Sequence, residues 1–517
     1  MKKNKTPFDY ALANPITSLV DKAPSDFTRK DMMHVFEEKQ IERIGFHYTA
    51  IDGKLKELKI PISNPRQLET ILAEGERVDG SSLFKGMVDA SVSDLYVVPL
   101  YRSAFLNPFD PGSLDFICRY ITKDGELAPF APDNILNKAY RIFQERTGLE
   151  LHALAELEFF LISDKDPSIF HAQKQHGYHA AAPFIKSGTI MNEMIRHITQ
   201  ICGNVKYAHS EVGYIECIRS DLPEIRDKSG EQLEIEFQLR PMEEAADNAI
   251  LGRWLIRNIA YQHGSVVTFA PKIEEGVAGN GLHFHMALVK EGKNVMSDEQ
   301  GSLCPEARKL IGGLCRYAET LTAFGNTVSA AYLRLVPNQE APTRICWSDL
   351  NRSAMIRVPL GWSNVDHLAK KINPQETEEF RRAGGRQTVE LRSPDGSAFV
   401  HLLLAGMVMA AEWGLTNPAA LDLAQKLYVT GNIFKNKELL NSLQALPTSC
   451  VESSRALLKQ RELYEREGVF PASIIEYIAR LLQKENDEGM NQRLVDLPAD
   501  DRLHETRKIM HKCLHEQ

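Results

Sequence analysis

The sequence predicts a protein of the α+β class that contains more than one domain. Its 517 residues are too many for one ordinary domain, and the 43% of hydrophobic residues are enough to build a large core. Stretches with the two-residue period of strands occur along the chain, and stretches with the spacing of helices occur beside them. The charged fraction of 25% is typical of a globular protein.

The first part of the chain is expected to form a small mixed domain. Residues 41–62 alternate partly between apolar and polar side chains, and Asp52-Gly53 in their middle is a dipeptide typical of hairpin turns. Residues 95–100 predict another strand. Asp124-Gly125, followed by two prolines, marks the expected end of this domain.

Helices are predicted in the second part of the chain. Apolar residues recur at helical spacing in 134–147, in 191–202 and in 246–263, and the residues beyond about 435 are charged and helical in character. These patterns divide the chain into four predicted segments: a polar, proline-containing arm at 1–30, the small domain at 31–125, a large second domain at 126–495 and a helical tail at 496–517.

Four predicted strands carry charged or imidazole side chains on one face. Residues two positions apart in a strand share a face, and the pairs are Glu156 and Glu158, Glu234 and Glu236, His283 and His285, and Glu390 and Arg392. A single pair of this kind is usually a solvated face, and a lone histidine is usually structural. If the strands share one sheet, however, the crowded carboxylates require compensation, and Mg²⁺ or Mn²⁺ suits such oxygen-rich sites.

The composition excludes several classes of protein. The net charge of −8 argues against general nucleic-acid binding, which requires a basic face. The eight cysteines form no C-x-x-C pair, which is typical of reduced thiols in the cytoplasm. The N-terminus lacks the apolar core of a secretory signal, and the longest apolar run, residues 402–411, is about half the length that spans a bilayer. We expect a cytoplasmic protein without nucleic-acid or membrane partners.

The order and spacing of several motifs resemble those of the glutamine synthetase family over nearly the whole chain. They match the family's N-terminal signature, metal-binding E-x-E, HHEV box, G-Q-x-E-I box and later boxes. The matching segments are VDGSS at 78–82, SDL at 93–95, AELEFF at 155–160, HSEV at 209–212, EQLEI at 231–235, TFAPK at 268–272, GNGLHFH at 279–285, RLVPNQEAP at 334–342, NRSAMIRVP at 351–359 and VELRSPD at 389–395.

The resemblance implies a fold, an activity and an assembly. The fold is a β-grasp-like N-terminal domain and a larger catalytic domain whose curved antiparallel sheet forms a funnel flanked by helices. The activity is an ATP-dependent ligation that makes an amide at the γ-carboxylate of glutamate through γ-glutamyl phosphate, with ammonia as the expected acceptor. ATP is the co-substrate, and two or more Mg²⁺ or Mn²⁺ ions are expected per site. The assembly is a homo-oligomeric ring, often double as in a dodecamer, with sites between subunits.

The resemblance also implies roles for individual residues. One metal ion is expected on Glu158, Glu211 and Glu234, and the other on Glu156, His283 and Glu390. The phosphate contacts implied are His285, Arg352 and Arg357, and the implied binders of the substrate carboxylate are Arg334 and Arg392. Around the acceptor amine, the resemblance implies Asp79 as the group that polarises or deprotonates ammonium, Tyr178 and Ser82 as pocket walls, and Glu340 as the flap residue that accepts a proton and excludes water.

The sequence departs from the family in several places. GYIECIRSDLPEIRDKSG, at residues 213–230, is longer than the usual connection, the glycine loop before His283 is shorter, and GYHAAAPFI lacks the usual Asp. Two alternatives to ammonia-dependent glutamine synthesis therefore stay open: a γ-glutamyl ligase that uses a polyamine or other organic amine, and a non-catalytic structural or regulatory relative. Retention of all six metal ligands disfavours the latter. A generic acidic metal-binding protein leaves the four arginines at 334, 352, 357 and 392 unexplained.

Overall fold

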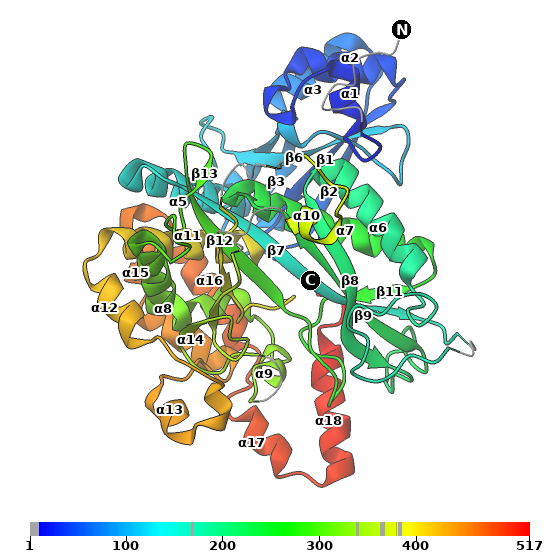
Figure 1. The fold of residues 1–517 in the computed structure, drawn as a ribbon. Helices are drawn as coiled ribbons and strands as arrows, with labels where there is room; N and C mark the ends of the chain where they lie inside the picture. The colour runs from blue at the N-terminus through cyan, green and yellow to red at the C-terminus, as the bar shows by residue number, and fades with distance from the viewer. Residues whose placement is uncertain are drawn as a thin grey trace.

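The chain folds around two β-sheets, as a computed structural model shows for residues 10–166, 170–337, 341–361, 368–378, 380 and 385–516. A six-stranded sheet lies in the N-terminal part, and a ten-stranded sheet forms the centre of the larger part, where long helices cover it (Figure 1). The predicted α+β class is therefore confirmed. Within the described ranges, no helix has both the length and the apolar character that crossing a membrane requires.

The N-terminal sheet contains the predicted hairpin. Its turn includes Gly53, whose φ of 75° is readily adopted by glycine. The strand order is β2-β1-β6-β4-β3, with β5 beside β6, and the sheet is mixed because β1 and β6 run parallel. The strands are β1 (Arg43–Thr49), β2 (Leu55–Pro61), β3 (Glu76–Asp79), β4 (Asp94–Pro99), β5 (Phe105–Leu106) and β6 (Ser113–Ile121), and the helices are α1 (Pro15–Val20), α2 (Arg29–Glu38), α3 (Pro65–Glu74) and α4 (Gly80–Leu83).

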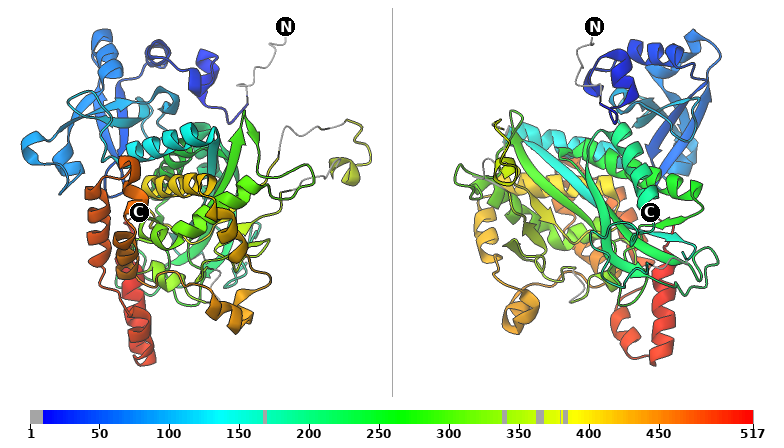
Figure 2. Two further views of the ribbon diagram at one scale, coloured as in Figure 1. Left: turned by 90° about the vertical axis from the view of Figure 1, so that its left-hand side faces the viewer. Right: turned by 45° about the vertical axis from the view of Figure 1, so that its right-hand side comes forward.

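The larger sheet contains all four strands that carry the alternating charged residues. Its main order is β14-β15-β16-β12-β7-β9-β8, and Figure 2 shows it curling through the body of the molecule. The pairing is antiparallel as expected except between β14 and β15, which are parallel because the connection between them returns the chain to the same end of the sheet. The strands are β7 (Glu150–Ser163), β8 (Val205–Ile215), β9 (Ser229–Phe237), β10 (Arg240–Pro241), β11 (Val266–Thr268), β12 (Leu282–Lys290), β13 (Lys293–Asn294), β14 (Trp347–Asp349), β15 (Ile356–Val358) and β16 (Val389–Leu391).

A buried helical layer supports this sheet. The apolar run noted in the sequence forms the centre of α11 (Val400–Thr416), which is buried along nearly its whole length and packs against α5 (Pro132–Thr147), α7 (Met242–Gln262) and α8 (Pro305–Gly325). The crossing with α8 needs glycine, because a Cβ on Gly313 would lie 2.0 Å from the carbonyl oxygen of Ala410. The predicted helices at 134–147, 191–202 and 246–263 are confirmed as α5, α6 (Gly188–Cys202) and α7.

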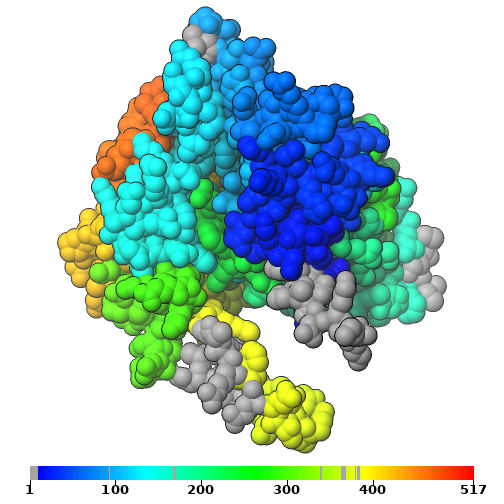
Figure 3. Space-filling view, turned by 90° about the horizontal axis from the view of Figure 1, so that it is seen from above, coloured from blue at the N-terminus to red at the C-terminus, as the bar shows by residue number. Residues whose placement is uncertain are grey.

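Shorter helices complete the C-terminal half. Seen from above, the segment that includes α10 projects from the body (yellow in Figure 3), whereas α14 and α16 pack against each other and against α8. These helices are α9 (Ala331–Arg334), α10 (Leu368–Ile372), α12 (Ala419–Lys426), α13 (Lys437–Ser442), α14 (Cys450–Lys459), α15 (Glu462–Glu465), α16 (Ala472–Gln483), α17 (Met490–Val495) and α18 (Ala499–Lys512).

A buried ionic network joins the N-terminal sheet to the helical layer. Arg119 of β6 donates a hydrogen bond to Asp247 of α7 at 2.6 Å, and His401 of α11 contacts the other oxygen of Asp247 at 3.2 Å. Asp133 of α5 lies 3.5 Å from Arg119. All four side chains are at most 14% exposed. Because a buried charge without its partner is costly, this network fixes how the two parts pack together.

Candidate functional site

Strand register brings the acidic pairs of the sequence together on one face of the larger sheet. Glu156 of β7 lies opposite Glu236 of β9 on one side and opposite His283 of β12 on the other. Glu158, two residues along β7, lies opposite Glu234. Three separate stretches of the chain thus place carboxylates and imidazoles side by side, as the alternating pattern predicts when its strands share a sheet.

One cluster of possible metal ligands combines Glu156, His283 and Glu390, with ligand atoms within 4.8 Å of one another. His283 Nδ1 lies 3.0 Å from Glu156 Oε2 and 3.7 Å from Glu390 Oε1. The three side chains are at most 14% exposed. This is the set that the resemblance implies for one ion, and two carboxylates with one imidazole suit a divalent cation of the Mg²⁺ or Mn²⁺ kind.

A second cluster contains a residue that the sequence analysis did not assign. Glu211 and Glu234 share it with His209, whose Nε2 lies 3.4 Å from Glu234 and whose Nδ1 lies 3.7 Å from Glu211. Glu158, expected in this set, lies beside it: its Oε2 accepts a hydrogen bond from the backbone N–H of Gly281 at 2.8 Å. The alternation of His209 and Glu211 within HSEV is the signal that could have identified the histidine.

A third group joins the first cluster to β9. Glu156, Glu236 and His285 have ligand atoms within 4.8 Å, and His285 Nε2 lies 2.8 Å from Glu156 Oε1. Glu236 is 1% exposed and pairs with Lys206 at 2.5 Å. In the sequence, Glu236 belongs to an E-x-E pair without a predicted role, and His285 is predicted to contact phosphate.

The acidic groups influence each other's protonation. Burial, together with the charges of nearby carboxylates, raises the pKa of Glu234 to about 8. Burial lowers the pKa of His209, but Glu234 outweighs it and the net pKa is about 9. Burial also opposes the charge of Glu156, yet His285 and His283 hold the pKa of that carboxyl well below its usual value. This crowding of acids around shared imidazoles is the environment that a divalent cation relieves, so the residues fit a metal centre.

Three arginines border the clusters. Arg357 of β15 and Arg392, which follows β16, bind the two oxygens of Glu390 at 2.9 and 2.5 Å. Arg334 of α9 is buried and donates hydrogen bonds to the carbonyl oxygen of Ser393 at 3.0 Å and to His283 Nε2 at 3.2 Å. The guanidinium groups therefore face the metal-ligating carboxylates, where planar donors suit a phosphoryl group or a carboxylate.

The residues expected around the acceptor amine are not all in one place. Tyr178 is 52% exposed, and its ring lies 5.4 Å from that of His209, so it borders the second cluster. Burial and Glu211 raise the pKa of Tyr178, while the nearby charge of Arg352 lowers it. Arg352 itself is exposed.

Asp79 is the exposed last residue of β3 and Ser82 is an exposed residue of α4, and Ser82 Oγ donates to Asp79 Oδ2 at 2.6 Å. Bonds from Ser82 and Ser81 lower the pKa of Asp79 to about 2. Glu340 falls outside the described residues.

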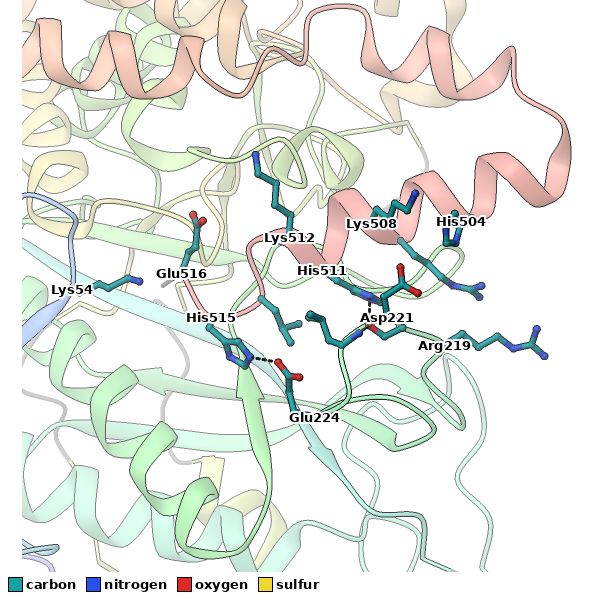
Figure 4. A pocket seen from close by; sticks show the side chains of 14 residues that line it. Lys54, Arg219, Asp221, Glu224, His504, Lys508, His511, Lys512, His515 and Glu516 are labelled. Atoms are coloured by element: carbon teal, nitrogen blue, oxygen red, sulfur yellow. Dashed lines mark hydrogen bonds and ion pairs between the residues drawn. The ribbon is translucent and has the colours of Figure 1, made fainter.

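The insertion and the C-terminal helix support the loop that leads into β12. His511 of α18, labelled in Figure 4, connects the insertion to this loop. Its Nδ1 accepts a hydrogen bond from Ser220 Oγ of the insertion, and its Nε2 donates one to the carbonyl oxygen of Ile273 in the loop, each at 2.9 Å. Arg507 pairs with Glu274 at 3.1 Å. A cavity of about 690 Å³ lies between these segments. The insertion thereby helps to position the loop of residues 273–281. The last residue of this loop, Gly281, donates its N–H to Glu158.

Two family models match the chain. The model described as the catalytic domain of glutamine synthetase matches residues 130–494, and the one described as its beta-Grasp domain matches residues 40–123. The glutamine synthetase of Thermococcus kodakarensis is 30% identical over 459 residues, which cover 88% of this chain and 91% of that protein. The glutamine synthetase of Mycobacterium bovis is 27% identical over 504 residues, which cover 90% and 97%.

Solved structures have the same fold at lower identity. The structure titled "Apo GmaS without ligand" is 20% identical and superposes with a TM-score of 0.68, covering 92% of this chain and 98% of that one. A structure of Plasmodium falciparum glutamine synthetase is 20% identical with a TM-score of 0.70 over the same shares. The expected β-grasp-like domain and larger catalytic domain are thus confirmed at the level of the fold.

Proposed function

The chain belongs to the glutamine synthetase family, and on that basis we propose that it joins ammonia to the γ-carboxylate of glutamate to give glutamine. It is an ATP-dependent carbon–nitrogen ligase of the glutamate–ammonia type. The observation that carries the proposal is the single sheet face on which the clusters around Glu156 and Glu234 adjoin the arginines at 334, 357 and 392. A structural protein needs no such concentration of opposed charges.

Divalent cations fit the clusters on this face. The proposed ligands are Glu156, His283 and Glu390 for one ion, and Glu158, Glu211 and Glu234, with His209 beside them, for the other. When bound, such ions neutralise the carboxylates and the phosphate charges of ATP. Mg²⁺ and Mn²⁺ both suit this donor set.

The proposed reaction has two steps, and the arginines are proposed to hold the groups that react. Transfer of the γ-phosphoryl group of ATP to the glutamate γ-carboxylate makes an acyl phosphate, which the amine attacks at carbon while phosphate leaves with the C–O bonding electrons. Arg352 and Arg357 are proposed to hold the phosphoryl group, His285 to contact phosphate, and Arg334 and Arg392 to bind glutamate. Tyr178 and Ser82 are proposed to line the amine pocket, and Glu340 to close it.

The proposed assembly is a ring of identical subunits in the cytoplasm, with each site completed by a neighbour. The exposed Asp79 accepts hydrogen bonds from its close neighbours Ser81 and Ser82, which leaves Asp79 and Ser82 available to an adjoining subunit as the proposed deprotonating group and pocket wall. Ile372 and Phe380, each 79% exposed, lie in or just after the projecting α10 segment, where a contact with another subunit would cover them (Figure 3). All eight cysteines are free thiols, which favours the cytoplasm.

An acceptor panel tests the proposal. Purified protein with glutamate, ATP and Mg²⁺ is expected to release phosphate and form glutamine when ammonia is added. Glu158→Ala should abolish both signals, whereas the matched control Glu216→Ala, at an exposed glutamate, should retain them. Phosphate release that persists in Glu158→Ala, or its absence with every acceptor in the unmodified protein, would refute the ligase assignment and favour a non-catalytic relative.

A second candidate function is γ-glutamyl transfer to an organic amine. It is favoured by a specific observation: a cavity of about 290 Å³ lies directly beside Glu211, on the side of the site where the amine is proposed to enter. Ammonia alone does not require a space of this size. The same panel, extended to organic amines, separates the two candidates.

A further inference from the structure

Beyond Glu158, the sheet face that carries the proposed metal ligands becomes apolar, and residues that follow α18 cover it there. We propose that Leu514, one of these residues, and Thr268 of β11 are positioning residues of the site, which together hold the Gly281 N–H against Glu158. This inference rests on the proposed ligase function, in which Glu158 holds a divalent cation, and deepens it by naming two residues that act on that ligand from a distance.

Strand register places Thr268 on the same sheet face as Glu158. Phe160 follows Glu158 by two residues in β7, so their side chains share a face. Thr268 lies directly opposite Phe160 in the antiparallel pair of β7 and β11, and residues opposite each other in such a pair also share a face. The Thr268 hydroxyl is therefore on the side of the sheet where the proposed metal ligands lie.

The apolar end of this face is covered by segments from distant parts of the chain. Leu514 is 1% exposed and belongs to a cluster of buried apolar residues that includes Phe160. The long connection at residues 213–230 supplies Ile218 and Ile225 to the same cluster, so it helps to form the surface on which Leu514 packs. The other buried members are Ile162, Ile215, Ala270, Ile273 and Val277.

The Thr268 hydroxyl joins Leu514 to the segment that follows β11. Its Oγ1 donates a hydrogen bond to the carbonyl oxygen of Leu514 at 2.7 Å and accepts one from the N–H of Ala270 at 3.0 Å. Thr268 is fully buried, so water does not replace either partner. Removal of the hydroxyl would leave two buried backbone groups without a hydrogen bond, which the segment can relieve only by moving.

Two more hydrogen bonds continue this chain to the proposed metal ligand. The carbonyl oxygen of Ala270 accepts from the side-chain amide of Asn280, which is fully buried, at 2.9 Å. The next residue, Gly281, donates its N–H to Glu158 Oε2 at 2.8 Å. The bonds from α18 hold the middle of the loop, at residues 273 and 274, whereas this chain holds the end of the loop that contacts Glu158.

The first experiment measures the position of the loop without catalysis. Hydrogen exchange, followed by mass spectrometry on the full-length protein, reports on the N–H groups of Asn280 and Gly281, which are bonded to Pro271 and Glu158. Thr268→Val keeps the shape of the side chain but loses the hydroxyl, and it should increase this exchange about tenfold or more. Thr268→Ser should leave the exchange unchanged, because a serine hydroxyl makes both bonds.

Thr320→Val is the matched control. Thr320 of α8 is also fully buried, and its hydroxyl also makes two hydrogen bonds, one with the carbonyl oxygen of Tyr317 and one with the hydroxyl of Tyr464. This variant should leave the exchange of the loop unchanged. An equal increase in Thr268→Val and Thr320→Val would indicate general loosening of the protein and would overturn the inference.

Mn²⁺ binding without nucleotide, followed by electron paramagnetic resonance, measures the effect on the metal site. Thr268→Val should weaken about tenfold the site that Glu158→Gln also weakens, because groups that orient a ligand affect the affinity for its metal. The other site should keep its affinity, and Thr268→Ser should keep both. Unchanged loop exchange together with unchanged Mn²⁺ affinity in Thr268→Val would overturn the inference.

Leu514→Ala tests the contribution of the residue after α18. It should increase the exchange of the loop, whereas Leu457→Ala, at an equally buried leucine of α14 in the main core, should not. Combined with Thr268→Val it should add little, because both changes act on one link, and fully additive effects would overturn the inference. Neither measurement needs turnover, so each result decides the inference whether or not the acceptor panel confirms the proposed function.

Discussion

Glu390 is predicted to stabilise the fold far more than its fellow ligand Glu158, although both are proposed to hold metal. Glu390 Oε1 lies 2.5 Å from Arg392, which is 3% exposed, and Oε2 lies 2.9 Å from Arg357, which is 17% exposed. Burial opposes its charge, but Arg392 outweighs burial and keeps the pKa of Glu390 below its usual value. Glu390→Gln removes the charge that binds both guanidinium groups, and breaking a buried ion pair in this way costs about 3–5 kcal/mol.

Glu158→Gln is the matched control. Its carboxylate accepts hydrogen bonds from neutral donors, the N–H of Gly281 and the side-chain amide of Gln232, and burial raises its pKa. A neutral side chain is therefore tolerated there, and we expect a cost of about 1 kcal/mol or less.

Urea unfolding in EDTA at one protein concentration measures both variants without metal. The difference in unfolding free energy should reach about 2 kcal/mol or more, which is the gap between the two costs. Replacing Arg392 by Gln in the Glu390→Gln background should recover part of the loss, because both members of the buried ion pair are then neutral. Equal stabilities for Glu390→Gln and Glu158→Gln would refute the reasoning from burial and pairing.

Three further predictions follow from the structure. Glu156→Gln should weaken Mn²⁺ binding on the order of 10–100-fold or more, as followed by electron paramagnetic resonance, because Glu156 belongs to two clusters; Glu150→Gln on the same strand should not. Burial opposes the charge of Asp247, but Arg119 outweighs it, so the pKa of Asp247 is lowered. The ionised Asp247 therefore contributes its full stabilisation above its ordinary pKa of 3.8, and this contribution is lost as the pH falls further. Asp247→Asn should lower the free energy of unfolding by about 3–5 kcal/mol at neutral pH. It should also make that free energy depend less on pH in the acid range, as measured by urea unfolding at a series of pH values. Asp79→Asn should lower kcat/KM for the amine about 100-fold or more without changing the unfolding midpoint; unchanged kinetics would contradict its proposed role.

The pairs of ionisable residues were predictable from the sequence because strand geometry has a period of two. Glu156 and Glu158 had to share a face whatever the register. The partners across strands were not predictable from the pattern, because register depends on long-range pairing that no local period encodes. The position of Glu236 directly opposite Glu156 is a result of that register. Glu390 and Arg392, by contrast, are two residues apart, so the pattern places them on one face, and in the structure they form an ion pair.

The irregularity in β8 explains why the second cluster was harder to foresee. Four residues of β8 span the distance that two residues of β9 cover between Ser210 and Tyr214, which is a bulge in the sheet. His209 and Glu211 keep the two-residue alternation and share the cluster, whereas the pairing of β8 beyond Ser210 shifts in a way that sequence periodicity does not contain. Glycine fits closely inside the bulge, because a Cβ there would lie 2.5 Å from Gln232 Oε1 and 2.8 Å from Cζ of the buried Phe160.

The same bulge connects metal binding to acceptor choice. Glu211 lies within the bulge and belongs to the second cluster, and Gly213 and Tyr214 of the same stretch line the cavity beside it. The insertion begins with the last residues of β8 and is held against α18 by the bond between Ser220 and His511. A change in the length or anchoring of the insertion would therefore act on the strand that carries both a proposed metal ligand and the wall of the acceptor cavity. On this argument Ser220→Ala should alter the preference among amines more than it alters the affinity for Mn²⁺, because the ligands on β7, β9 and β12 do not depend on that bond.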